Sequence, residues 1–221
     1  NTVVGGDKVY VESMASSVFG GTVDERGGAG STFISVGGNT RLLGSAFQTG
    51  TAGGNLYGGS RQYSWVTGDT EVEIKDNASI AGSVFGGGIG NGYKGYDGVG
   101  GNTSITVSGS AEVVGDIYGG GKNGNVAGNA AVEVNANFRG DIYGGGCSGA
   151  VFGRIVITIA AGCDAAGAFI YAGGTGDVNT ATKTGDAITV NINSAVCNQA
   201  YNIVLGTCND ASSAGNATVY G

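Results

Sequence analysis

Apolar and polar residues alternate in short stretches along this chain, and glycines separate the stretches from one another. Each stretch opens with Gly and a polar residue, often Asn or Asp, and then places apolar residues at every second position. Alternation with a period of two is typical of strands that bury one face. The stretches start at Gly6, Gly30, Gly68, Gly101, Gly128, Gly153, Gly185 and Gly215.

A second pattern follows each of the earlier stretches: an aliphatic residue, an aromatic residue and then usually Gly. It occurs at 18–20, 84–86, 117–119, 142–144 and 170–172. Ala46-Phe47 is a plausible additional copy, and Leu56-Tyr57-Gly58 repeats the pattern within the same repeat. A short middle strand is expected between the two patterns, at 77–80, 110–113 and 135–138.

Three short strands separated by Gly or Asn corners therefore make one repeat. Such strands cannot bury their apolar side alone, but stacked repeats bury all of them in one continuous core. We expect an all-β, single parallel β-helix domain over residues 1–221, with about seven coils of about 4.8 Å each. The chain has no proline, which fits strands whose N–H groups are all needed between coils.

The sequence "DIYGGG" occurs at Asp116–Gly121 and again at Asp141–Gly146. A phosphate-binding loop would need a following helix and a Lys-Ser/Thr pair, and neither follows here. We interpret the three glycines as a sharp corner where a positive φ costs little.

These features resemble the right-handed parallel β-helix superfold of pectate lyases, phage tailspikes and bacterial surface adhesins. The resemblance covers the whole chain at the level of architecture. Right-handedness is inferred because left-handed helices of this kind use strict hexapeptides. The Gly-rich coils look most like extracellular repeat regions of large bacterial surface proteins, which implies a secreted or surface-bound monomeric rod. The incomplete repeat at Gly215–Gly221 predicts that the segment stops partway into a longer rod.

Composition narrows the function. Only 12% of the residues are charged and 41% are hydrophobic, which is opposite to a disordered chain. The ten Lys and Arg residues are scattered and the net charge is −7, which argues against a nucleic-acid partner. No run of 18 apolar residues occurs, so we expect no membrane insertion.

The absence of His excludes Ser-His-Asp and Cys-His chemistry. The pectin-active hydrolases that the chain resembles also use a His, and the lyases need a calcium-binding Asp cluster and an Arg. Asp116 and Asp141 occupy equivalent positions, where earlier repeats have Ser17, Ser45 and Ser83. Calcium needs six to eight oxygens, so two solvated acids are the favoured interpretation. We expect no enzyme, metal or cofactor.

Four cysteines lie in the last third of the chain: Cys147, Cys163, Cys197 and Cys208. No CxxC pair occurs, which argues against zinc. A Cys197–Cys208 disulfide and buried thiols both stay open. Three Asn-x-Ser/Thr sequons begin at Asn77, Asn102 and Asn216, and corner positions that bond their own backbone are sufficient to explain them.

The aromatic residues of the second pattern should form a ladder along one face: Phe19, Phe47, Phe85, Tyr118, Tyr143 and Tyr171. Neighbouring side chains of a strand point to opposite faces. We expect the aliphatic residues inside and the aromatic residues half exposed. Such a ladder is either a strip for stacking glycans or a stack that only stabilises neighbouring coils.

The longest loops, including Thr22–Gly30, Ser60–Thr67, Ile89–Gly98 and Thr175–Gly185, all leave the corner after these glycines. Tyr, Trp and Arg dominate binding hot spots, and two successive loops are rich in them. We expect a non-enzymatic binding module for a host glycoprotein, such as mucin or immunoglobulin, or a glycan. The alternatives are a structural stalk with solvated loops and a polysaccharide lyase. The candidate binding residues are Arg61, Tyr63, Trp65, Tyr93, Lys94 and Tyr96.

Overall fold

The computed structural model describes residues 2–4, 10–11, 17–22, 27–43, 54–90, 98–161, 163, 167–176, 188–192, 202–204, 208–209 and 217–220. In these ranges the chain forms strands, turns and bends and no helix, so the all-β prediction is confirmed. None of the described residues belongs to a helix with the length and apolarity needed to cross a membrane.

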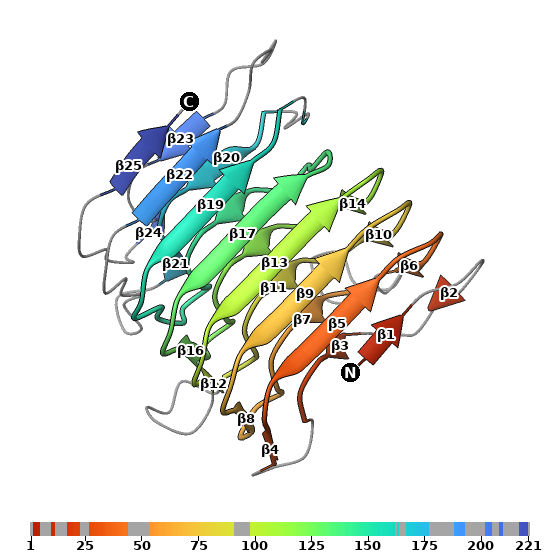
Figure 1. The fold of residues 1–221 in the computed structure, drawn as a ribbon, viewed down its shortest axis with the longest axis vertical. Helices are drawn as coiled ribbons and strands as arrows, with labels where there is room; N and C mark the ends of the chain where they lie inside the picture. The colour runs from red at the N-terminus through yellow and green to blue at the C-terminus, as the bar shows by residue number, and fades with distance from the viewer. Residues whose placement is uncertain are drawn as a thin grey trace.

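The largest sheet, sheet A, contains eight parallel strands that follow one another in chain order. It forms from the alternating stretches, and its strands lie side by side from the N-terminal to the C-terminal end of the molecule (Figure 1). The strands are β1 (Thr2–Val4), β5 (Thr32–Val36), β9 (Thr70–Ile74), β13 (Thr103–Ser108), β17 (Ala130–Asn135), β19 (Ile155–Ile159), β22 (Ile188–Ile192) and β25 (Ala217–Tyr220).

Three further sheets, also parallel, contain shorter strands, and a two-stranded sheet pairs β21 (Thr175–Gly176) with β24 (Cys208–Asn209). Sheet B contains β2 (Tyr10–Val11), β6 (Arg41–Leu42), β10 (Ser79–Ile80) and β14 (Glu112–Val113). Sheet C contains β3 (Val18–Phe19), β7 (Leu56–Tyr57), β11 (Val84–Phe85), β15 (Ile117–Tyr118), β18 (Ile142–Tyr143), β20 (Phe169–Tyr171) and β23 (Asn202–Val204). Sheet D contains β4 (Gly28–Ala29), β8 (Trp65–Val66), β12 (Gly98–Val99) and β16 (Asn125–Val126).

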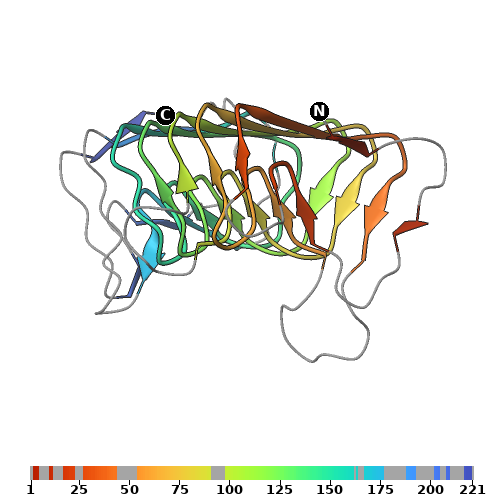
Figure 2. The same cartoon turned by 90° about the horizontal axis from the view of Figure 1, so that it is seen from below.

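We call the chain from one strand of sheet A to the next a circuit. Between β9 and β13 the chain passes through β10, β11 and β12, one strand of each other sheet. The circuit therefore has four strands, and the expectation of three was wrong because the sheet D strands lie in segments that read as loops. Viewed from below, successive circuits stack along the molecule (Figure 2). Parallel strands in stacked sheets are compatible with the predicted β-helix.

The core lies between the sheets. It contains the inward-facing side chains of the described strands in which buried and more exposed residues alternate. Ile105, Val107, Val132 and Val134 are at most 1% exposed, which confirms them as core residues. Three buried threonines also point inward at the start of their strands. Thr32, Thr70 and Thr103 each donate a hydrogen bond of 2.6 Å to the carbonyl oxygen of a glycine that directly follows a sheet C strand. These bonds satisfy the hydroxyl groups that burial would otherwise leave unpaired.

One repeat has a different register from the one expected. Leu56 pairs with both Val18 and Val84, so Leu56-Tyr57 is the sheet C copy of this circuit. Asn55 therefore occupies the position that was assigned to Ser45. Ser45, Ala46 and Phe47 lie outside the described residues.

The glycines of the corner after sheet C are required for a different reason from the one expected. The glycines with positive φ in the described residues are Gly38, Gly54, Gly109 and Gly167, and none belongs to a Gly-Gly-Gly run. Instead, a Cβ on Gly119 would collide with the carbonyl oxygen of Gly144 in the next circuit, and would lie 3.2 Å from Val132. Close stacking of backbones, rather than a left-handed turn, excludes a side chain here.

Candidate functional site

The turns that connect sheet C to sheet D stack along one edge of the molecule. We call this surface the turn edge, and it comprises the turns at 60–65, 87–90, 121–125 and 146–150. Backbone hydrogen bonds of 2.7–2.9 Å join each turn to its neighbours: Arg61 N to Thr22 O, Ile89 N to Ser60 O, Lys122 N to Gly88 O, Asn123 N to Cys147 O and Ser148 N to Thr175 O. The side chains on this edge are therefore carried on a fixed backbone.

Arg61 and Tyr63 project from the first of these turns. Both side chains are exposed, Tyr63 to 47%. A hydrogen bond of 3.1 Å from Ser64 N to Arg61 O closes the turn between them. Among the described residues, no carboxylate lies within ion-pair distance of Arg61. This turn therefore presents a cation and a ring to solvent.

Trp65 is placed differently from the exposed loop residue that the sequence suggested. It lies in β8 and is partly buried. A Cβ on Gly28, in the previous circuit, would lie 2.9 Å from the indole Nε1 and 3.1 Å from the adjacent ring carbon. The indole therefore packs on the neighbouring strand, and only part of it faces solvent. Truncation of Trp65 would cost stability as well as any binding.

The other three predicted binding residues, Tyr93, Lys94 and Tyr96, lie outside the described residues. The two glycines that flank them are described: Gly90 bonds to Lys122, and Gly98 pairs with Trp65. Sequence reasoning missed Lys122, which is exposed at the same edge. The signal that could have found Lys122 is its position directly after a Gly-Gly-Gly corner.

The aromatic ladder is a second buried core and not a half-exposed strip. Ring centroids of successive members lie 4.6–4.9 Å apart, in the order Phe19, Tyr57, Phe85, Tyr118, Tyr143 and Tyr171. The four central rings are 1–7% exposed, and Ile89 and Cys147 pack against them. The expectation of half exposure was wrong, because residues of the turns after sheet C pack against the rings. Their faces contact each other, which leaves no central ring face for a glycan.

Asp116 and Asp141 are structural residues of this ladder. Asp116 Oδ1 accepts a hydrogen bond of 2.9 Å from Asp141 N, and Oδ2 accepts one of 3.1 Å from the Tyr118 hydroxyl. Asp141 accepts equivalent bonds from Phe169 N at 2.9 Å and from the Tyr143 hydroxyl at 3.4 Å. Burial, and secondarily the Asp116 carboxylate, raises the pKa of Tyr118. Both acids are thus half-buried and hydrogen-bonded, and the interpretation as solvated acids was wrong.

The polar residues that open the strands of sheet A form a second ladder at the surface. Asp69, Asn102 and Asn129 each accept a hydrogen bond of 2.7–2.9 Å from the backbone N–H of the next circuit. The sequon residue Asn77 donates to Asn39 at 3.1 Å. The expectation that these side chains bond their own backbone was wrong. They bond residues of neighbouring circuits instead. Asn216 lies outside the described residues.

Two cysteines, Cys147 and Cys163, are thiols. Within the described residues Cys147 and Cys163 form no disulfide, and Cys163 donates a hydrogen bond of 3.5 Å to Val134 O. Burial raises the pKa of the Cys147 thiol. Cys197 lies outside the described residues, so the Cys197–Cys208 disulfide stays a prediction. No three metal-binding side chains of the described ranges lie close enough to hold an ion.

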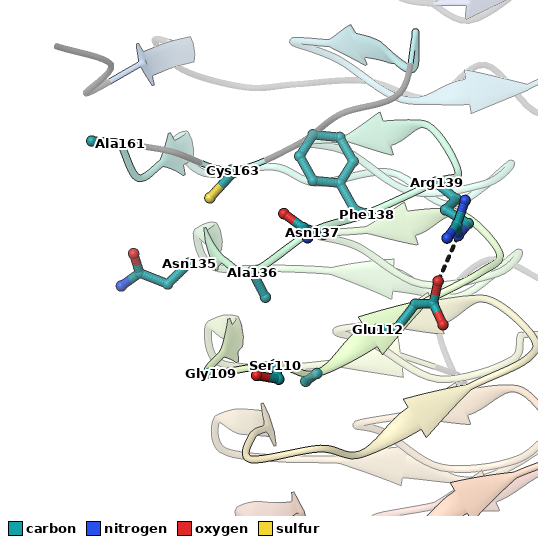
Figure 3. A pocket seen from close by; sticks show the side chains of 11 residues that line it. Gly109, Ser110, Glu112, Asn135, Ala136, Asn137, Phe138, Arg139, Ala161 and Cys163 are labelled. Carbon is teal, nitrogen blue, oxygen red and sulfur yellow. Dashed lines mark hydrogen bonds and ion pairs between the residues drawn. The ribbon is translucent and has the colours of Figure 1, made fainter. Parts of the chain in front are cut away.

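A hollow of about 380 Å³ lies at the corner between sheets A and B (Figure 3). It forms because this corner is shorter in one circuit than in the circuit before it. Val107 pairs with Val134 and Val113 pairs with Phe138, so residues 108–112 lie opposite residues 135–137 only. The exposed Ser110, Asn135 and Asn137 line it, together with the ion pair between Arg139 and Glu112. The hollow is therefore polar and its described charges are paired.

A scan against protein-family models matches no family, and searches of curated proteins and of solved structures return no match.

Proposed function

We propose that this chain is a non-enzymatic binding module of a bacterial surface or secreted protein, built as a right-handed parallel β-helix. Its turn edge binds a host glycoprotein, such as mucin or immunoglobulin, or a glycan. The observation that carries the proposal is the turn at 60–65, where exposed Arg61 and Tyr63 stand beside the half-buried indole of Trp65.

The backbone of this turn supports a binding role. Ser60 and Arg61 bond to the circuits on both sides, so the ligand would not have to order the turn. A pre-ordered site loses less conformational entropy on binding. Tyr, Trp and Arg are also the residues in which binding energy concentrates. The turn thus combines the residue types of a hot spot with a fixed framework.

The environment of the acids supports a function other than catalysis. A polysaccharide lyase of the resembling superfold would need carboxylates available for calcium. Asp116 and Asp141 instead use both oxygens to bond backbone N–H groups and ladder hydroxyls. A metal ion at either carboxylate would compete with these hydrogen bonds.

A structural stalk is the second candidate, and the aromatic ladder favours it. Six stacked rings and a parallel ladder of carboxylates and amides join successive circuits without any need of a ligand. A stalk would hold another domain at a distance and would show no affinity of its own.

The deciding experiment is a binding screen of the purified module against mucin, immunoglobulin and a glycan panel. We expect saturable binding that a double Arg61→Ala, Tyr63→Ala variant abolishes. The matched control is Phe152→Ala with Arg154→Ala, which removes an exposed ring and a cation with the same spacing at another corner. Absence of any ligand would favour the stalk. A calcium-dependent rise in absorbance on polygalacturonate would favour the lyase.

A further inference from the structure

One position of the turn edge has a positive φ in three described circuits. Tyr63, Asn123 and Ser148 each lie three residues before the equivalent sheet D positions Val66, Val126 and Val151, and their φ angles are 64°, 57° and 57°. The turn at 60–65 is one residue longer than the turns at 121–125 and 146–150, yet all three have a left-handed residue at this distance before sheet D. The approach to sheet D therefore takes a left-handed residue whether Tyr, Asn or Ser fills the position.

Tyr is a poor choice for this conformation. Asn is several-fold enriched in the left-handed region, whereas a bulky residue there is an outlier that costs stability. Packing does not compensate, because the Tyr63 side chain is 47% exposed. Among the described residues it stacks on no ring and makes no side-chain hydrogen bond. The folded module thus gains little from this ring and would be more stable with Asn.

Two cations flank the ring on the same edge. Arg61 lies two residues before Tyr63, and Lys122 lies two circuits further along, about 10 Å away by strand spacing. Both are exposed, and neither has a carboxylate partner in the described part of the chain. These two cations, which have no carboxylate partner among the described residues, provide local positive charge for an acidic ligand.

Apart from Arg61, Tyr63 and Lys122, the turn edge exposes few side chains. Gln62 and Asn123 are exposed, and Ile89, Asn125, Cys147 and Ser148 are partly exposed, whereas the glycines of these turns are buried. A protein partner needs about 800 Å² on each side, with several large anchors. A sugar needs one ring face and a few polar groups, and the turn at 60–65 supplies these.

We propose that Tyr63 is retained in a strained position because it is the anchor for an acidic glycan. A sugar ring lies against the Tyr63 ring, and its carboxylate or sulfate group binds Arg61. A second acidic group of the same chain reaches Lys122. This inference rests on the proposed binding function and names the ligand class of the same site.

The test is the Tyr63→Asn variant, which installs the residue found at position 123. We expect its melting temperature to rise by about 2–4 °C, because the strain at this corner is relieved. We expect its affinity for immobilised acidic glycan to fall at least about tenfold, as for a hot-spot residue. Phe152→Asn is the matched control, since it also replaces an exposed ring by Asn but lies outside the turn edge. It should leave binding unchanged.

The probes separate the two sources of acid. Sialyllactose is compared with lactose, and sulfated chondroitin with its desulfated form, each at low and high salt. Binding to one acidic member of a pair, weakened by salt and by Arg61→Gln but not by Arg154→Gln, supports the proposal and identifies the acid. Equal binding of acidic and neutral members overturns it.

Three further outcomes also overturn the inference. A Tyr63→Asn variant that melts lower and binds normally would show that Tyr63 stabilises the corner. Binding of enzymatically deglycosylated mucin with no glycan bound would leave the proposed binding function standing with a protein ligand. A module that binds nothing at all would remove the proposed function itself.

Discussion

Single residues in this molecule are constrained most where backbones or side chains of successive circuits touch. Val132 is 1% exposed and pairs with Ile105 on one side and Ile157 on the other. Ala131, the preceding residue of the strand, faces outward and is exposed. Two adjacent positions with the same backbone therefore tolerate very different side chains.

Replacement of Val132 by Asp should prevent folding. A carboxylate at this position would be buried between two aliphatic side chains without a hydrogen-bond donor, at a cost of about 4 kcal/mol or more. The measurement is soluble yield and a thermal melt followed by circular dichroism. Ala131→Asp is the matched control and should melt close to the parent. A soluble Val132→Asp variant with a cooperative melt would show that the described register is wrong.

At the scale of elements, sheet C differs from the other sheets because it buries residues on both faces. Its aliphatic residues enter the main core, and its aromatic residues form the buried ladder on the opposite side. Burial raises the pKa of both Tyr57 and Tyr118, because the ionised phenols would lose their hydration. The ladder thus requires its hydroxyl groups to stay neutral.

The ladder predicts a loss of stability in alkali. At a pH below the unfolded-state pKa of 10.0, these two phenols are neutral in both the folded and the unfolded state, and their contribution to the free energy of unfolding is fully present. As the pH rises above this value, the unfolded phenols ionise while the folded ones do not, so unfolding becomes more favourable. We expect the urea midpoint to stay constant up to about pH 9 and to fall from there to about pH 11.

A Tyr57→Phe, Tyr118→Phe variant provides the control for this effect. Its free energy of unfolding at neutral pH should be lower by about 0.5–1.5 kcal/mol, because the hydrogen bond from the Tyr118 hydroxyl to Asp116 is lost. Its urea midpoint should depend less on pH than that of the parent. The comparison is made in a Cys147→Ala background, because burial also raises the pKa of that thiol. An equal alkaline loss in parent and variant would exclude the ladder as its cause.

At the scale of the whole molecule, each circuit contacts mainly the circuits before and after it. All named strand pairs are parallel and join consecutive circuits. In such an arrangement stability is close to a sum over repeats and their interfaces. The register also repeats, since Ile105, Val132 and Ile157 occupy one position in three successive strands.

Removal of one complete circuit, residues 128–152, should therefore leave a folded, shorter molecule. Deletion joins Ala127 to Gly153 and places β19 against β13 and Tyr171 against Tyr118 in the existing register. We expect a cooperative melt at a lower temperature, a circular dichroism spectrum without helix, and retained binding at the turn edge. The hollow between sheets A and B would be lost with Asn135 and Arg139.

The control deletion removes 128–139 only and should unfold the chain, because later strands would then meet the wrong sheet. Equal behaviour of the two deletions would contradict the repeat-based account of stability.

The sequence by itself determined the strands of sheet A, their inward residues and the stacking of repeats. Alternation with a period of two decides which face of a strand is buried, and that information is local. It also identified Arg61, Tyr63 and Trp65 as neighbours. The short strands of sheet D were missed because two residues are too few for a periodic pattern, as in Trp65-Val66.

Only the tertiary structure decided what covers each strand and what each corner requires. The aromatic ladder is buried because turns from the same circuits pack over it, and no periodicity within sheet C carries that information. The glycines after sheet C are needed because the next circuit's carbonyl lies too close for a Cβ. The left-handed conformation of Tyr63 could not be predicted from the sequence either. The circuits stacked around a corner set its geometry, and the residue that occupies the corner does not.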